Sequence, residues 1–220
     1  MDDQAMSSEG NRTQPKPLSA EDLVALVGSR LCHDLISPLG AIGNGLELLQ
    51  YTPEVAGLVE TPEIQLINQS VEAARVRINW FRVAFGQAGA GQRLGGDAMA
   101  RLFRDADREG RIRLGYNAEG DLSRSDARLI LLGIMCLEVA MPWGGFIKVS
   151  REGSGWKLVA EAERIKANPA LWGWLNDVAS AGLATLSASE VQFGLMRQFA
   201  TQEGRKLSWS MDERGCEIAF

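Results

Sequence analysis

Two long stretches of helical hydrophobic periodicity, one directly after the other, restrict the folds that this chain can adopt. In the second stretch, apolar residues recur alternately three and four positions apart, at Ile64, Ile67, Val71, Ala74, Ile78, Phe81 and Phe85. This heptad spacing is typical of the seam of a coiled coil or helix bundle. Thr61 can cap the helix, Pro62 suits its first position, and Gly86 is a natural stop.

The first stretch predicts a helix of about 30 residues that begins at Ser19, with a weak capping box between Ser19 and Asp22. Its apolar stripe consists of Val24, Val27, Leu31, Leu35, Leu39, Ile42, Leu46 and Leu49. Residues 51–60 join the two helices into an antiparallel hairpin. Because a hairpin alone has too little core, we expect its seam to pack on a second copy, which gives a four-helix bundle in a homodimer.

The rest of the chain predicts a domain in which helices and strands mix. Five glycines between residues 86 and 97 mark the boundary. Helices are predicted at 98–109, 125–140 (capped by Ser125), 168–178 and 187–202. Strands are predicted at 111–116, 146–151, 156–161, 206–211 and 216–220, the last four forming two hairpins. The fold class is therefore α+β: a tail at 1–17, a helical hairpin at 18–90, and an α/β sandwich at 98–220 with helices on one face of a mixed sheet.

Composition excludes several classes of protein. With 23 basic against 28 acidic residues the net charge is −5, which argues against nucleic-acid binding through bulk charge. The longest apolar run, residues 129–137, is half the roughly 20 residues that a membrane span needs, and we expect no signal peptide. Three distant cysteines and one histidine give no metal-ligand spacing. The odd number of widely separated cysteines indicates free thiols in a reducing compartment. We expect a cytoplasmic protein without a metal site or a membrane contact.

The segment around His33 contains residues that a long helix normally avoids. Pro38 cannot donate to the carbonyl of Asp34 and should kink the helix, at a cost of roughly 3 kcal/mol. Three glycines between residues 40 and 45 each cost about 1 kcal/mol relative to alanine. A long helix that tolerates such residues usually does so for function.

Helical geometry predicts that His33 is exposed. At 100° per residue it lies about 160° from Leu31 and Leu35, and so it points away from the apolar stripe. Its neighbours on this outer face are Ser29, Arg30, Ile36, Ser37, Gly40, Asn44 and Glu47. Since most of these are small or polar, another globular protein could approach the imidazole closely. An ordinary surface histidine beside a kink is the alternative interpretation.

The motif His33-Asp34-Leu35-x-x-Pro38 resembles the phosphoacceptor box of dimeric sensor histidine kinases. The longer run at 29–47 closely resembles the bacterial ChpT-type histidine phosphotransferases, and the likeness extends through 81–86 and, more weakly, over the C-terminal domain. This resemblance implies a phosphorelay shuttle. In such a shuttle, the histidine takes a phosphoryl group from the receiver aspartate of a hybrid kinase and passes it to the aspartate of a response regulator.

The resemblance also implies roles for individual residues. His33 is the expected nucleophile and phosphocarrier, which suits an imidazole near pH 7, and Asp34 is its acidic partner, as a base or only to orient the ring. The residues expected around the phosphate or at the docking surface are Ser29, Arg30, Ser37, Pro38, Gly40 and Asn44. Among them, Arg30 is the candidate to neutralise phosphate. The receiver would supply Mg²⁺, so we expect no cofactor in this chain.

ATP binding has little support in the sequence. A kinase ATP site has an asparagine-rich helix and an Asp-x-Gly-x-Gly loop, whereas the apolar helix at 125–140 has no asparagine and the loop motif is absent. The resemblance therefore implies a C-terminal domain similar to a degenerate kinase ATP-binding domain, kept for dimer stability or partner docking. Two alternatives stay open: a non-catalytic pseudokinase scaffold that docks receivers, and a fragment of an ATP-dependent autokinase.

Overall fold

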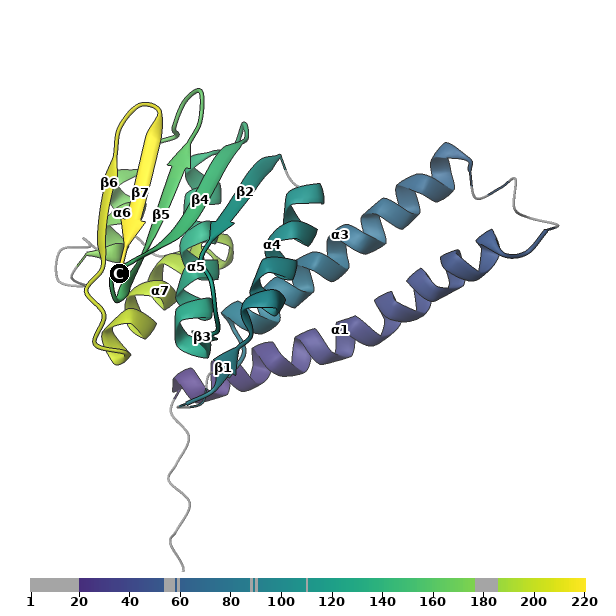
Figure 1. Cartoon of the computed structure of the whole chain (residues 1–220), viewed down its shortest axis with the longest axis horizontal. Helices are drawn as coiled ribbons and strands as arrows, with labels where there is room; N and C mark the ends of the chain where they lie inside the picture. The colour runs from purple at the N-terminus through teal and green to yellow at the C-terminus, as the bar shows by residue number, and fades with distance from the viewer. Residues whose placement is uncertain are drawn as a thin grey trace, which may run out of the picture.

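The computed structural model has a long helical hairpin attached to a sheet that carries helices on one face (Figure 1). It describes residues 20–53, 58, 60–87, 89, 91–109, 111–176 and 186–220. The predicted tail at 1–17 and the predicted capping residue Ser19 lie outside these ranges. The predicted α+β class is confirmed, because helices and a five-stranded mixed sheet occur in one chain.

The hairpin consists of α1 (Ala20–Gln50) and α3 (Pro62–Ala84), which lie against each other in antiparallel directions (Figure 1). α1 continues through Pro38 as one helix, so the proline does not interrupt it. α3 ends two residues before the predicted stop at Gly86. Both long periodic segments are therefore helices close to their predicted bounds.

Five strands form a sheet in the order β2-β4-β5-β7-β6. They are β2 (Ile112–Asn117), β4 (Gly145–Glu152), β5 (Gly155–Glu161), β6 (Ser208–Met211) and β7 (Gly215–Ala219). β2 pairs with β4 in parallel and the other neighbours are antiparallel, which confirms the mixed sheet and both predicted hairpins. A separate short pair, β1 (Arg93–Leu94) with β3 (Leu122–Ser123), lies partly in the glycine-rich segment where the sequence indicated only a linker.

Helices cover one face of this sheet. They are α4 (Gly96–Glu109), α5 (Arg124–Ala140), α6 (Pro169–Trp172) and α7 (Val191–Gln202), with 3-10 turns at Gly173–Leu175 and Ala188–Glu190. The helix predicted at 168–178 is shorter, because it changes to a 3-10 turn after one α-helical turn. Residues 177 and 178 lie outside the described ranges.

Of two predicted helix caps, Thr61 is at the N-cap position of α3, as predicted, and the one at α5 is wrong. The Thr61 hydroxyl does not cap α3 and donates instead to the carbonyl of Leu58 at 2.7 Å. At α5 the cap is Ser123, whose hydroxyl oxygen accepts a backbone N–H three residues further on at 2.9 Å. The predicted cap Ser125 lies inside the first turn, and its hydroxyl donates to Glu203 at 2.7 Å. The sequence predicted Ser125, and the position where β3 ends makes Ser123 the cap instead.

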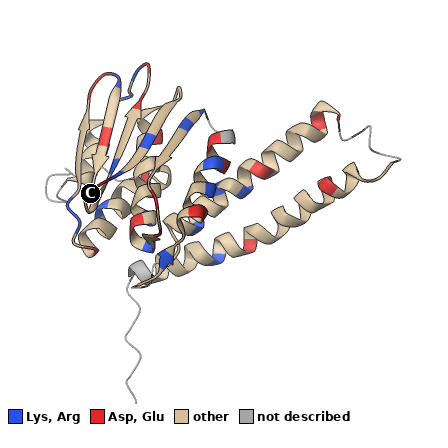
Figure 2. Cartoon of the chain, viewed as in Figure 1, with Lys and Arg blue, Asp and Glu red and all other residues tan. Residues whose placement is uncertain are grey.

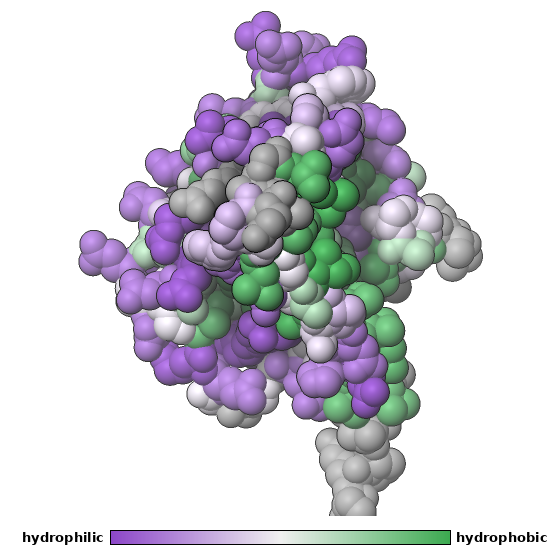
Figure 3. All heavy atoms as spheres, turned by 90° about the vertical axis from the view of Figure 1, so that its right-hand side faces the viewer, coloured by the Kyte–Doolittle hydropathy of each residue, from purple (hydrophilic) through white to green (hydrophobic). Residues whose placement is uncertain are grey.

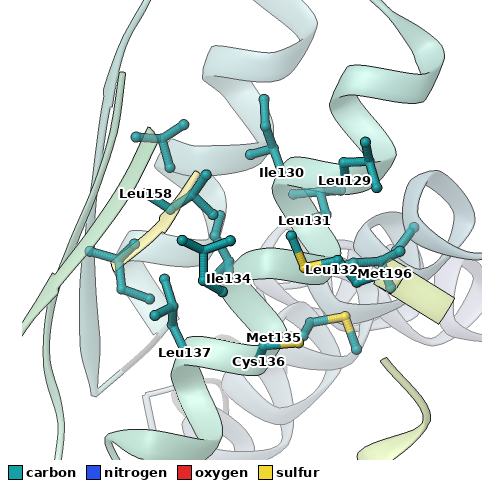
Figure 4. Packing of buried hydrophobic residues seen from close by; sticks show 14 of the residues in the cluster. Leu129, Ile130, Leu131, Leu132, Ile134, Met135, Cys136, Leu137, Leu158 and Met196 are labelled. Carbon is teal, nitrogen blue, oxygen red and sulfur yellow. The ribbon is translucent and has the colours of Figure 1, made fainter. Parts of the chain in front are cut away.

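The centre of the core is α5, which is buried around nearly its whole circumference. Figure 4 shows Ile134 and Leu137 pointing toward Leu158 of β5, while Leu132 lies near Met196 of α7. Gly133 permits this close approach, since a Cβ there would lie 2.8 Å from a methyl carbon of Leu158. The continuous apolar run in the sequence thus corresponds to a helix enclosed by the sheet and by other helices.

This core extends into the hairpin. Trp80, Val83 and Ala84 near the end of α3 are buried in the same hydrophobic cluster as α5. At the junction, Arg77 of α3 donates two hydrogen bonds to the carboxylate of Glu138 in α5, at 2.8 and 3.1 Å. Although the sequence pattern changes near residue 90 from long helices to mixed helices and strands, the hairpin and the sandwich share one hydrophobic core.

The apolar stripe of α1 is largely exposed in this single chain. Leu31 and Leu35 are 58% and 50% exposed. α1 approaches α3 closely at Gly43, where an added Cβ would lie 3.8 Å from a methyl carbon of Val71. Long stretches of both helices carry no charge (Figure 2), and hydrophobic atoms gather in a broad patch on the end of the molecule seen in Figure 3. Most of the large apolar residues that remain exposed belong to the hairpin.

Candidate functional site

His33 lies in the middle of α1, and its side chain is 81% exposed. Because α1 is one continuous helix, the ring lies about 160° around it from Leu31 and Leu35. The exposed histidine that the sequence predicts is therefore present, on the side of the hairpin opposite to the apolar stripe. The hairpin thus has a polar His33 face and an apolar face, and α3 lies between them.

The carboxylate of Asp34 bridges two side chains of its own helix. One oxygen, Oδ1, lies 3.0 Å from Nδ1 of His33, and the other accepts a hydrogen bond from Nε of Arg30 at 2.6 Å. The hydrogen bond with His33, followed by that with Arg30, lowers the pKa of Asp34. Asp34 is therefore ionised near neutral pH, so Nδ1 of His33 carries the hydrogen that it shares. In the neutral ring this leaves the lone pair on Nε2.

Arg30 pairs with Asp34, and its expected role as a phosphate contact stays a prediction. Its side chain, 76% exposed, forms an i, i+4 ion pair with Asp34. Such exposed pairs contribute little to stability. Arg30 thus holds Asp34, and Asp34 holds His33.

The other predicted site residues do not contact the imidazole through hydrogen bonds. Ser37 and Asn44 are exposed on the same side of α1 further along the helix. The surface at Gly40 is open, since a Cβ added there would meet no other atom within 4 Å. Pro38 lies about 140° around α1 from His33, and so it falls on the apolar side with Leu31 rather than at the His33 face.

Ser29 lies one turn before His33 and is half-buried. It is next to the end of α3, because a Cβ added to Gly86 would lie 3.4 Å from the Ser29 hydroxyl oxygen. One turn before Gly86 is a residue that the sequence interpretation missed. Arg82 belongs to the segment 81–86, which resembles the phosphotransferase family, and the sequence alone assigned it no role.

Metal ligands are not gathered in the described parts of the chain. No group of three or more His, Cys, Asp or Glu side chains there could hold a metal ion. The three cysteines are free and buried. Among the same residues, no helix is both long and apolar enough to cross a membrane.

Comparison with known protein families assigns this chain to one of them. The model described as histidine phosphotransferase C-terminal domain matches residues 96–215, more than half of the chain. The chain belongs to the histidine phosphotransferase family. The matched segment begins after the hairpin, so the assignment rests on the sandwich and not on the residues around His33.

Two relatives agree with this family. A curated protein of Brucella abortus (strain 2308), named protein phosphotransferase ChpT, is 39% identical over 148 residues, which are 64% of this chain and 66% of that protein. A solved structure described as a 1.7 Å structure of a bacterial phosphotransferase has a TM-score of 0.67 and 28% identity. That similarity covers 93% of this chain and 98% of the solved one, and so it includes the hairpin.

Proposed function

We propose that this histidine phosphotransferase is a phosphorelay shuttle, in which His33 accepts a phosphoryl group from a receiver-domain aspartate of a hybrid kinase. It then passes the group to the aspartate of a response regulator, in the reducing cytoplasm that the free thiols favour. The observation that carries the proposal is the exposed His33 ring, whose Nδ1 is held by an ionised Asp34 and whose Nε2 is directed away from it.

The geometry suits nucleophilic transfer. Nε2 of His33 attacks the phosphorus of the aspartyl phosphate, the acyl–phosphate bond breaks, and the receiver aspartate leaves as a carboxylate. The ring gains positive charge as the N–P bond forms, and the Asp34 carboxylate stabilises it through Nδ1–H. Transfer to the second aspartate reverses these bond changes. No group of this chain needs to act as a metal ligand, because the receiver would supply Mg²⁺.

A homodimer accounts for the apolar face of the hairpin. Exposed apolar residues on this face include Val24, Val27, Leu31, Leu35, Ile42 and Leu49. A contiguous apolar surface of this kind marks an interaction site. A second copy of the same hairpin is the occupant that fits, since it offers an identical uncharged face, and it would complete a four-helix bundle. His33 points away from that face and would stay accessible in the dimer.

The shared core supports the absence of an ATP-dependent step. An autokinase must bring an ATP-binding domain to its own histidine, whereas here the sandwich is joined to α3 through buried Trp80 and the Arg77–Glu138 pair. The resemblance implies that α5 corresponds to the asparagine-rich helix, and α5 fills the core with apolar side chains. The resemblance of the sandwich to a degenerate kinase domain stays a prediction.

Phosphotransfer from a labelled phospho-receiver tests the proposal on the native chain and on His33→Gln. We expect label on the native protein only. Label on both proteins would exclude His33 as the acceptor, and label on neither would favour the pseudokinase scaffold. Labelling by ATP alone, with no kinase present, would support the autokinase fragment.

A further inference from the structure

A group of three arginines lies at the end of α3, close to the His33 face. Arg124 donates a hydrogen bond to the carbonyl of Arg82 at 2.7 Å, and Arg128 donates one to the carbonyl of Gly86. We call Arg82, Arg124 and Arg128 the arginine trio. Two of them thus hold the C-terminal end of α3 against the start of α5.

The contacts between the hairpin helices place Arg82 at the height of His33. A Cβ added to Gly28 would lie 3.2 Å from Cβ of Phe85, so these two positions face each other. Since the helices are antiparallel, Arg82, three residues before Phe85, is level with residue 31, three residues after Gly28. His33 is two residues further, which is about 3 Å along the axis.

Arg82 is also near the part of α1 that carries His33. Burial raises the pKa of the Cys32 thiol, and the positive charge of Arg82 opposes this rise. The guanidinium is therefore close to the residue that immediately precedes His33. The neighbouring Gly86 lies beside Ser29, which is one turn before His33 on the same face of α1.

The trio lacks the negative charge that would balance it. Within the described ranges, the Arg82 guanidinium forms no hydrogen bond or ion pair. Arg128 is only 7% exposed, yet its Nε has no partner, while its guanidinium lies over the Phe199 ring. The charge of Glu203 acts on Arg128 and partly opposes the effect of burial and of Arg124 on its pKa.

Burial and like charge both act against this cluster. They lower the pKa of Arg124 and of Arg128, with the charge of Arg82 contributing to the first and that of Arg124 to the second. An anion bound beside Arg82 would relieve this repulsion. By contrast, Arg30, which the sequence favoured for phosphate, is already neutralised by Asp34.

We infer that Arg82, supported by Arg124 and Arg128, is the cationic contact for the phosphoryl group carried on His33. This inference rests on the proposed function. Arg82 would form a charge-assisted hydrogen bond with a phosphoryl oxygen. The two supporting arginines fix the end of α3 by donating hydrogen bonds to its backbone carbonyls.

The test uses Arg82→Ala and Arg82→Lys, with Arg75→Ala as the matched control. Arg75 lies on the same helix but is already paired with Glu72. Each full-length protein is phosphorylated with phosphoramidate, without any receiver, and titrated by phosphorus-31 NMR. Because the chain has one histidine, one phosphohistidine signal is expected.

We expect Arg82→Ala to raise the pKa of the phosphoryl group, since a nearby cation favours its dianion. It should also lower kcat for transfer from a phospho-receiver about tenfold while KM stays within twofold. Arg82→Lys should restore most of the native kcat and most of the native pKa of the phosphoryl group. Arg75→Ala should change neither quantity. Thermal unfolding of all variants should match the native protein.

Three results would overturn the inference. An unchanged phosphoryl titration with a raised KM would mean that Arg82 binds an acidic side chain of the receiver. Equal effects of Arg82→Ala and Arg75→Ala would show a general charge effect, and an activity loss that follows a drop in melting temperature would show a structural role. The proposed function fails separately, if His33→Gln gives the same phosphorus signal as the native chain.

Discussion

His33 and Asp34 are consecutive in α1, and Oδ1 of the aspartate lies 3.0 Å from Nδ1 of the imidazole. Consecutive side chains diverge by about 100° on a helix, so the two must lean together to meet. Within the described residues, this is the hydrogen bond that orients the ring. It directs Nε2 outward, where an incoming receiver can reach it.

Replacing Asp34 with Asn should therefore slow transfer without unfolding the protein. The amide keeps the size of the side chain but loses the negative charge that stabilises the ring as the N–P bond forms. A charge-assisted hydrogen bond is about twice as strong as a neutral one, and we expect kcat to fall about tenfold, equivalent to about 1.4 kcal/mol. Rapid-quench phosphotransfer measures this. An unchanged kcat would show that Asp34 has no part in the reaction.

Asp34 should stay ionised at pH values below those at which an ordinary aspartate becomes protonated. The bonds from His33 and Arg30 lower its pKa in the fold, so the stability that they provide is present above the unfolded pKa and is lost as pH falls through the folded pKa. Carbon-13 NMR should show a midpoint below about 3.9. Arg30→Gln should raise this midpoint, while Arg75→Gln should leave it in place. Equal midpoints in all three proteins would contradict the bridging role.

A charge placed on the apolar stripe should separate the homodimer. Leu31→Glu or Leu35→Glu would bury an unpaired carboxylate between two hairpins, which costs several kcal/mol. We expect light scattering at micromolar concentration to give half the mass of the native protein. Phe146→Glu alters an exposed apolar residue on the open face of the sheet and should not change the mass. A native chain that is already monomeric would rule out the bundle.

Gly40 should matter for docking and not for folding. A side chain there meets nothing within 4 Å, and leucine favours a helix over glycine by up to about 1 kcal/mol. Gly40→Leu should therefore unfold at an equal or higher temperature, yet raise KM for the phospho-receiver about tenfold by blocking its approach. A native KM in this variant would place the docking surface elsewhere.

The sequence predicted the parts of the fold that depend on local spacing. The 3.6-residue periodicity fixes α1 and α3, and the alternation around residues 152–155 and 212–215 fixes two β-hairpins. It also placed His33 opposite the apolar stripe, because rotation along a helix follows from sequence position alone. Caps were less predictable, since Ser123 and Ser125 are chemically equivalent and only the path of β3 distinguishes them.

Only the tertiary structure decided how these elements meet. The sequence could not show that Gly28 and Gly43 lie where α1 approaches the second helix of the hairpin, because that depends on how closely two helices approach. Nor could it bring Arg82 to the height of His33 on the neighbouring helix. The local sequence does not indicate which distant residues become neighbours. Tertiary packing, rather than periodicity, determines which charged side chains lie close enough to interact.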